Sequence, residues 1–137
     1  MASKARASKN VVLLCHQNAD PDAVCSAYVL QALLKDLAPG LGVEICCPEG
    51  VSASTKQLIE NLGIPVPGAA LLHEPDLMIL VDTNTLDQLG KTGEMLKKSG
   101  GELVIVDHHH PHPDMEKLAD QMIVDERAAA AAEVSIV

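Results

Sequence analysis

Three apolar runs in this sequence end on side chains that could bind metal ions. The runs are residues 11–15, 77–81 and 103–106. The ionisable residues that follow them are His16, Asp20, Asp22, Asp82, Asp107, His108 and His109. Several carboxylates at one point repel one another, and burial strengthens the repulsion unless a cation neutralises them. If the fold brings these segments together, their residue types therefore predict a centre for divalent cations.

The mixture of carboxylate oxygen and imidazole nitrogen narrows the choice of cation. Such a set favours manganese, cobalt or iron over calcium, with zinc and magnesium as alternatives. One aspartate at the centre could bridge two ions about 3.5–4 Å apart, and the pair would hold both an attacking water and a phosphoryl oxygen. Two divalent ions would change the formal charge from −9 to −5, so the acidic chain is compatible with a phosphate substrate.

Each of these residues also has a purely structural interpretation when it is taken alone. Asp20 or Asp22 could cap a following helix, because aspartate is a preferred N-cap residue. His110 and His112 each precede a proline and are typical of solvated loops, and His73 is expected at the surface. The prediction of a metal centre therefore depends on the joint occurrence of the three clusters.

A receiver-type phosphoacceptor domain is another interpretation, since it also gathers aspartates at the ends of parallel strands. Such a domain binds one magnesium ion and would have no use for His16, His108 and His109. The histidines therefore favour a hydrolytic metal centre over a phosphoacceptor.

The elements that must position these residues alternate along the chain. Strands are predicted at 11–15, 43–47, 77–81, 103–106 and 121–124, and helices at 22–37, 52–62 and 85–98. The strands are apolar throughout, which is typical of a parallel sheet that is buried on both faces. We therefore predict an α/β domain with a parallel sheet of about five strands, covered by helices on both faces. The carboxyl ends of such strands share one edge, where ligands bind.

The composition excludes several classes of protein. The 137 residues suit one domain with a real core, since 47% of them are hydrophobic. One tyrosine and no phenylalanine or tryptophan cannot make a base-stacking platform, and the net charge of −9 argues against binding of long duplex nucleic acid. The sequence shows neither a secretory signal nor a membrane span, so a cytoplasmic protein without membrane contact is expected. The four cysteines form no C-x-x-C pair and are expected to be reduced and buried.

With these motifs the sequence resembles the DHH phosphoesterase family, which includes nanoRNases, pAp phosphatases, RecJ-type exonucleases and family II pyrophosphatases. The first family motif is a histidine with two spaced aspartates before a small-residue helix start. The second is an aspartate that ends an apolar strand, and the third is the DHH triplet itself. The matching residues, in motif order, are His16, Asp20, Asp22, Ala23 and Ser26, then Asp82, then Asp107, His108 and His109.

The resemblance implies a catalytic domain with two divalent ions, for which Mn²⁺ is expected and Mg²⁺, Co²⁺ and Zn²⁺ are alternatives. By this resemblance, His16, Asp20 and Asp82 hold one ion. Asp22, Asp82 and His108 hold the second, so that Asp82 bridges the two.

The resemblance also implies how a substrate meets these ions. His109 is expected to face the substrate phosphate as an electrophile and Asp107 to fix an imidazole near the metals, so these two are the expected catalytic residues. His109 and His110 are the expected substrate contacts. The implied reaction is hydrolysis of a phosphoester in a small nucleotide or short single-stranded oligonucleotide by metal-activated water. The alternatives are a pyrophosphatase or polyphosphatase, and a non-catalytic regulatory module that binds metal or nucleotide.

The sequence departs from the family pattern towards its end. Where a fourth motif is usually rich in Ser and Thr, residues 128–133 read AAAAAE. The predicted organisation is a flexible arm at 1–10 and a DHH catalytic domain at 11–137, cut off before the linker and the second, substrate-binding domain of related enzymes. Weak or absent activity of the isolated domain is then expected, and a homodimer is one expected assembly.

Overall fold

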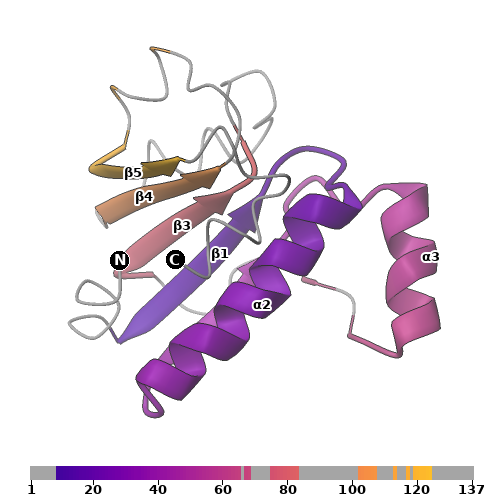
Figure 1. Ribbon diagram of the computed structural model, residues 1–137, viewed down its shortest axis with the longest axis horizontal. Helices are drawn as coiled ribbons and strands as arrows, with labels where there is room; N and C mark the ends of the chain where they lie inside the picture. Colours follow the sequence, from indigo (N-terminus) through magenta and orange to yellow (C-terminus); the bar gives the residue numbers. More distant parts are fainter. Residues whose placement is uncertain are drawn as a thin grey trace.

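A computed structural model describes residues 9–65, 67–68, 75–83, 102–107, 113, 117 and 119–124. In this part of the chain, five strands form one sheet: β1 (Asn10–Cys15), β2 (Gly42–Cys46), β3 (Leu77–Val81), β4 (Glu102–Asp107) and β5 (Gln121–Val124). The strands lie in the order β2-β1-β3-β4-β5, and every neighbouring pair is parallel. Figure 1 shows β1, β3, β4 and β5 side by side in this order. The predicted parallel α/β fold is therefore confirmed, with β2 one residue earlier than expected.

Two helices lie fully within the described residues, α2 (Pro21–Leu37) and α3 (Ala53–Leu62). The N-cap of α2 is Asp20, whose side chain accepts a hydrogen bond from the N–H of Ala23, and proline opens the first turn, where its missing N–H costs nothing. The N-cap of α3 is Ser52, and Gly63 ends the helix in the left-handed region, at φ 66°. Neither described helix is both long enough and apolar enough to span a membrane. The predicted helix at 85–98 and the alanine-rich tail lie outside the described residues.

The core follows from the alternation of side chains along each strand. The face that packs against α2 buries Val11, Leu13, Cys15, Leu77, Ile79, Val81, Val104 and Val106. The opposite face buries Val12, Leu14, Cys46, Met78, Leu80, Leu103 and Ile105. Helix α2 contributes Leu30 and Leu34, each worth about 2 kcal/mol of burial. Three of the four thiols are buried as expected, Cys25 is half-buried, and none of the four is in a disulfide.

The register of the sheet decides which side chains meet at its carboxyl edge. Cys15 of β1 pairs with Val81 of β3, which in turn pairs with Val106 of β4. The next residue in each strand direction is therefore His16, Asp82 or Asp107. Since the strands of a parallel sheet lie about 4.8 Å apart, these three residues leave the sheet side by side.

Candidate metal centre

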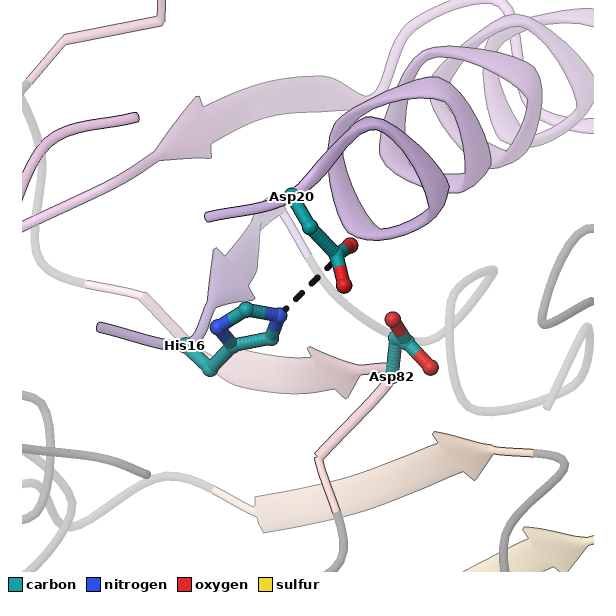
Figure 2. A group of neighbouring side chains, drawn as sticks. All are labelled: His16, Asp20 and Asp82. Atoms are coloured by element: carbon teal, nitrogen blue, oxygen red, sulfur yellow. Dashed lines mark ion pairs between the residues drawn. The ribbon is translucent and has the colours of Figure 1, made fainter. Parts of the chain in front are cut away.

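His16, Asp20 and Asp82 form a compact group at this edge. One donor atom from each residue, an imidazole nitrogen or a carboxylate oxygen, lies within 4.8 Å of the other two. Figure 2 shows the ring of His16, directly after β1, and the carboxylates of Asp20 and Asp82 turned towards one another. Asp20 stands at the start of α2 and Asp82 follows β3, so the group joins three separate elements. Among the described residues no other set of three or more has this arrangement.

The imidazole of His16 presents the correct nitrogen for a metal ligand. Its Nδ1 lies 2.8 Å from the carbonyl oxygen of Gln17. A carbonyl can only accept, so the proton of the neutral ring is on Nδ1 and the lone pair is on Nε2. Nε2 is the atom that faces Asp20, at 3.6 Å from Oδ1. The carbonyl of Gln17 thus fixes the tautomer, as the partners of ligating histidines commonly do.

The separation between His16 and Asp20 fits a shared ion better than a direct hydrogen bond. At 3.6 Å the two atoms exceed the usual N–H···O distance. Two donors that each lie about 2.1 Å from one ion are roughly 3–4 Å apart. The donor set and the spacing therefore both fit a small divalent cation.

Asp20 combines the two interpretations that the sequence left as alternatives. Its Oδ1 accepts the N–H of Ala23 at 2.9 Å, which makes it the N-cap of α2. The same carboxylate faces His16 and Asp82 (Figure 2). The cap holds the carboxylate at the positive end of the helix, where negative charge is favoured.

Asp82 is the most perturbed carboxylate of the site. Its side chain is 3% exposed. Burial, then repulsion from Asp22, Asp20 and Asp107, raises the pKa of Asp82 from 3.8 to about 9. Without a cation, another negative charge at this point is thus strongly disfavoured. A divalent ion reverses this balance, because its charge is the largest in such a site.

The backbone of Asp82 is also unusual. Its φ of 57° lies in the left-handed region, which aspartate tolerates better than most residues. Its N–H donates to the carbonyl of Val106 at 2.9 Å, which holds the residue against β4. A left-handed residue costs about 1–2 kcal/mol, and such costs cluster at functional sites.

Two further predicted residues lie near this group without joining it. Asp22 accepts a hydrogen bond from the hydroxyl of Ser26 at 3.2 Å, and its charge acts on Asp82. Asp107 is 1% exposed and also acts on Asp82. Neither provides a donor atom to the group of three.

The remaining predicted site residues lie outside the described part of the chain. These are His108, His109 and His110, and the segment 128–133 and His73 fall there too. The structural contacts that sequence reasoning missed are the carbonyl of Gln17 behind His16 and the donation from Ser26 to Asp22. A backbone carbonyl leaves no signal in residue types, whereas the spacing of Asp22 and Ser26, one helical turn apart, could have indicated the second contact.

A cavity of about 370 Å³ lies elsewhere, at the amino ends of β1 and β2. Its lining residues are Asn10, Val11, Lys35, Leu41, Gly42, Val43 and Glu44. It contains one lysine and one glutamate but no convergence of carboxylates and imidazole. Ligands of parallel α/β sheets bind at the carboxyl edge, so the group of His16, Asp20 and Asp82 is the better candidate for a functional site.

Comparison with known proteins gives three independent similarities. Residues 10–137 match the DHH family, N-terminal domain. The uncharacterized protein MJ0988 of Methanocaldococcus jannaschii is 30% identical over 124 residues, which are 90% of this chain and 36% of that protein. The structure of an exopolyphosphatase-related protein from Bacteroides fragilis has the same fold, with a TM-score of 0.71 at 17% identity, over 97% of this chain and 39% of that one.

The chain thus spans little more than a third of the length of either relative. The family match covers the three motifs and every described element of the sheet. The protein belongs to the DHH family, with which it shares the N-terminal domain.

Proposed function

We propose that this domain is a divalent-metal-dependent phosphoesterase that acts on a small nucleotide or short single-stranded oligonucleotide. The observation that carries the proposal is the meeting of His16, Asp20 and Asp82 within 4.8 Å at the carboxyl edge of the sheet. Membership of the DHH family supports it, because the matched motifs imply hydrolysis of phosphoesters. A cytoplasmic location and a homodimer stay predictions.

In this proposal His16, Asp20 and Asp82 hold one ion, and Asp22, Asp82 and His108 hold the second. A bound divalent cation would supply Lewis acidity, which lowers the pKa of water and offsets the charge of a phosphoryl group. The protein's own contribution is to fix the donors. The Gln17 carbonyl keeps the lone pair of His16 on Nε2, and the first turn of α2 holds Asp20.

The substrate side of the proposal concerns Asp107, His109 and His110. His109 and His110 are proposed to contact the phosphate. Asp107 is buried at 1% exposure next to Asp82, which suits a group that positions an imidazole better than one that contacts substrate. We therefore place Asp107 behind the metal ligands.

The test is Mn²⁺ titration of the purified chain, followed by assay with the p-nitrophenyl ester of thymidine 5′-monophosphate. We expect Mn²⁺ binding and release of p-nitrophenol, with both lost in Asp82→Asn and both kept in Asp76→Asn. Failure of the wild-type chain to bind Mn²⁺ overturns the proposal. Binding without turnover favours the non-catalytic module instead.

Hydrolysis of pyrophosphate or polyphosphate is the second candidate. The Bacteroides fragilis protein is described as exopolyphosphatase-related, and at 17% identity it supports the shared fold rather than the substrate. Phosphate release from pyrophosphate or from a short polyphosphate, measured beside the nucleotide ester, separates the two candidates. A faster reaction with the inorganic substrates would reassign the substrate class without changing the metal centre.

A further inference from the structure

The loop that holds His16 and Asp20 is tied to the start of α3 through one buried residue, Ala19. The Ala19 N–H donates to the carbonyl of Gly50 at 3.1 Å. The Ala19 carbonyl accepts two hydrogen bonds, from the Ser52 N–H at 2.9 Å and from the Thr55 hydroxyl at 2.8 Å. We call Gly50, Ser52 and Thr55 the α3 anchor. Both polar groups of the Ala19 backbone are thus bonded to the anchor.

Counting protons fixes the direction of each hydrogen bond in the anchor. The Thr55 hydroxyl has one proton, and the Ala19 carbonyl can only accept, so this proton points at Ala19. The Ser52 hydroxyl, 2.8 Å from Thr55 Oγ1, must then donate to Thr55. Ser52 Oγ in turn accepts the Thr55 N–H at 3.2 Å. Thr55 is 0% exposed, so water cannot take over these bonds.

The Ala19 carbonyl replaces half of a common helix cap at the start of α3. In a capping box, the side chain three residues after the N-cap reaches back to the N-cap N–H. Here the N-cap is Ser52, and its N–H is satisfied by the Ala19 carbonyl instead. Thr55, at the position of the reaching side chain, turns its hydroxyl to that same carbonyl. The loop before α2 therefore completes the cap of α3, although 36 positions separate Ala19 from Thr55.

The anchored carbonyl is one bond away from the backbone of a metal-centre residue. The Ala19 carbonyl and the Asp20 nitrogen belong to one planar peptide, so fixing the carbonyl orients the backbone from which Asp20 extends. The preceding Asn18 is left-handed, at φ 51°, and lies in the turn that leads to Ala19. The Asp20 side chain itself is 49% exposed, so packing alone does not hold it. Its position depends on the hydrogen bond from the Ala23 N–H and on the backbone that the anchor holds.

We propose that Thr55 is a positioning residue for the metal centre, because its hydroxyl, through the Ala19 carbonyl, sets where the Asp20 carboxylate lies relative to His16 and Asp82. This inference rests on the proposed metal binding and adds α3 to the elements that build the site. It predicts that a hydroxyl outside the ligand set controls the affinity for cations.

The test compares Thr55→Val, Thr55→Ser and Ile59→Val. Valine keeps the branched shape of threonine and removes only the hydroxyl, whereas serine keeps the hydroxyl. Ile59 is buried on the same helix at 3% exposure and its side chain has no hydrogen-bonding group, so its truncation lowers stability without removing a hydrogen bond to Ala19. Two quantities are measured: Mn²⁺ affinity by calorimetry, and amide hydrogen exchange at Ala19 and Ser52 in the metal-free protein.

We expect Thr55→Val to weaken Mn²⁺ binding roughly tenfold, the lower end of the effect of partners behind metal ligands, and to speed exchange at Ala19. Thr55→Ser should restore both, and Ile59→Val should leave Mn²⁺ affinity unchanged. Equal affinity of Thr55→Val and wild type overturns the inference while the metal centre stands. Equal loss in Ile59→Val and Thr55→Val also overturns it, because general destabilisation then explains the effect. No Mn²⁺ binding by the wild-type chain overturns both proposals.

Discussion

Aspartates at the two edges of the sheet have opposite environments. At the amino edge, Asp76 Oδ2 accepts the N–H groups of Lys9 and Asn10, at 2.8 and 3.1 Å, and Asp120 Oδ2 accepts the Leu103 N–H at 2.7 Å. These backbone bonds lower the pKa of Asp76. At the carboxyl edge, burial and neighbouring carboxylates raise the pKa of Asp82 to about 9.

The difference follows from the polarity of a parallel sheet. The first residues of its strands leave N–H groups without ladder partners, and the last residues leave carbonyls. A carboxylate at the amino edge therefore finds donors in the backbone. A carboxylate at the carboxyl edge meets strand carbonyls and other carboxylates, and the N–H groups there come from a helix start, as the Ala23 N–H does for Asp20. A cation is a partner that suits several such acceptors at once. The edge on which an aspartate lies thus decides whether its main partners are backbone N–H groups, as for Asp76, or other ionisable side chains, as for Asp82.

Replacing one aspartate at each edge should give the largest contrast. Asp82→Asn is expected to weaken Mn²⁺ binding more than about 100-fold, because it removes a charged donor, whereas loss of a group behind the ligands costs 10–100-fold. Asparagine keeps the shape and tolerates the left-handed backbone of Asp82. Asp76→Asn should bind Mn²⁺ like the wild type in calorimetry. Similar losses in both variants would contradict the contrast between the edges.

The same pair should diverge in stability when the ions are removed. With a chelator at pH 7, Asp82→Asn is expected to raise the free energy of unfolding by about 0.5–2 kcal/mol, the common range for a stabilising substitution. The gain arises because asparagine relieves a buried carboxyl that is surrounded by like charges. Asp76→Asn should lower the stability, since it weakens the acceptor for two backbone N–H groups. Urea unfolding of both variants measures this, and a destabilised Asp82→Asn would show that the carboxylate is structural.

How many of the contacts at the edges of the sheet can be predicted from the sequence depends on whether side chains or the backbone make them. Apolar runs and their flanking turns were sufficient to predict a parallel sheet, because buried strands that alternate with helices leave a recognisable pattern of residue types. The topology then placed His16 and Asp82 on neighbouring strands. The hydrogen bonds of the Thr55 hydroxyl and of Asp76 were not predicted, because each joins segments that are distant in sequence. The Gln17 carbonyl is next to His16, and it was not predicted because a backbone carbonyl leaves no signal in residue types. The two interpretations of Asp20 were also treated as alternatives, although one carboxylate both caps α2 and belongs to the group with His16 and Asp82.

Removing the Ser26 hydroxyl should have a smaller effect. This hydroxyl donates to a carboxylate at the carboxyl edge, as backbone N–H groups donate to Asp76 at the amino edge. Ser26 is 0% exposed and donates to Asp22 at 3.2 Å. Ser26→Ala should cost about 1 kcal/mol of stability and weaken Mn²⁺ binding about tenfold, because Asp22 loses the hydrogen bond from this hydroxyl. Cys25→Ser, the adjacent and half-buried position, serves as the control. Unchanged Mn²⁺ affinity in Ser26→Ala would remove Asp22 from the proposed site.

The smallest expected effect is the pH dependence of the hydrogen bonds that Asp76 accepts at the amino edge. Because hydrogen bonds from Lys9 and Asn10 lower the folded pKa of Asp76 below 3.8, ionised Asp76 stabilises the protein at pH values above 3.8. This contribution is lost as the pH falls through the lower, folded value. The difference in urea midpoint between wild type and Asp76→Asn should therefore be full at pH 7 and shrink below about pH 4. Asp36→Asn, at an exposed position of α2, controls for the change in net charge, and an equal pH profile in both variants would mean that bulk charge, rather than the backbone N–H groups, sets the behaviour of Asp76.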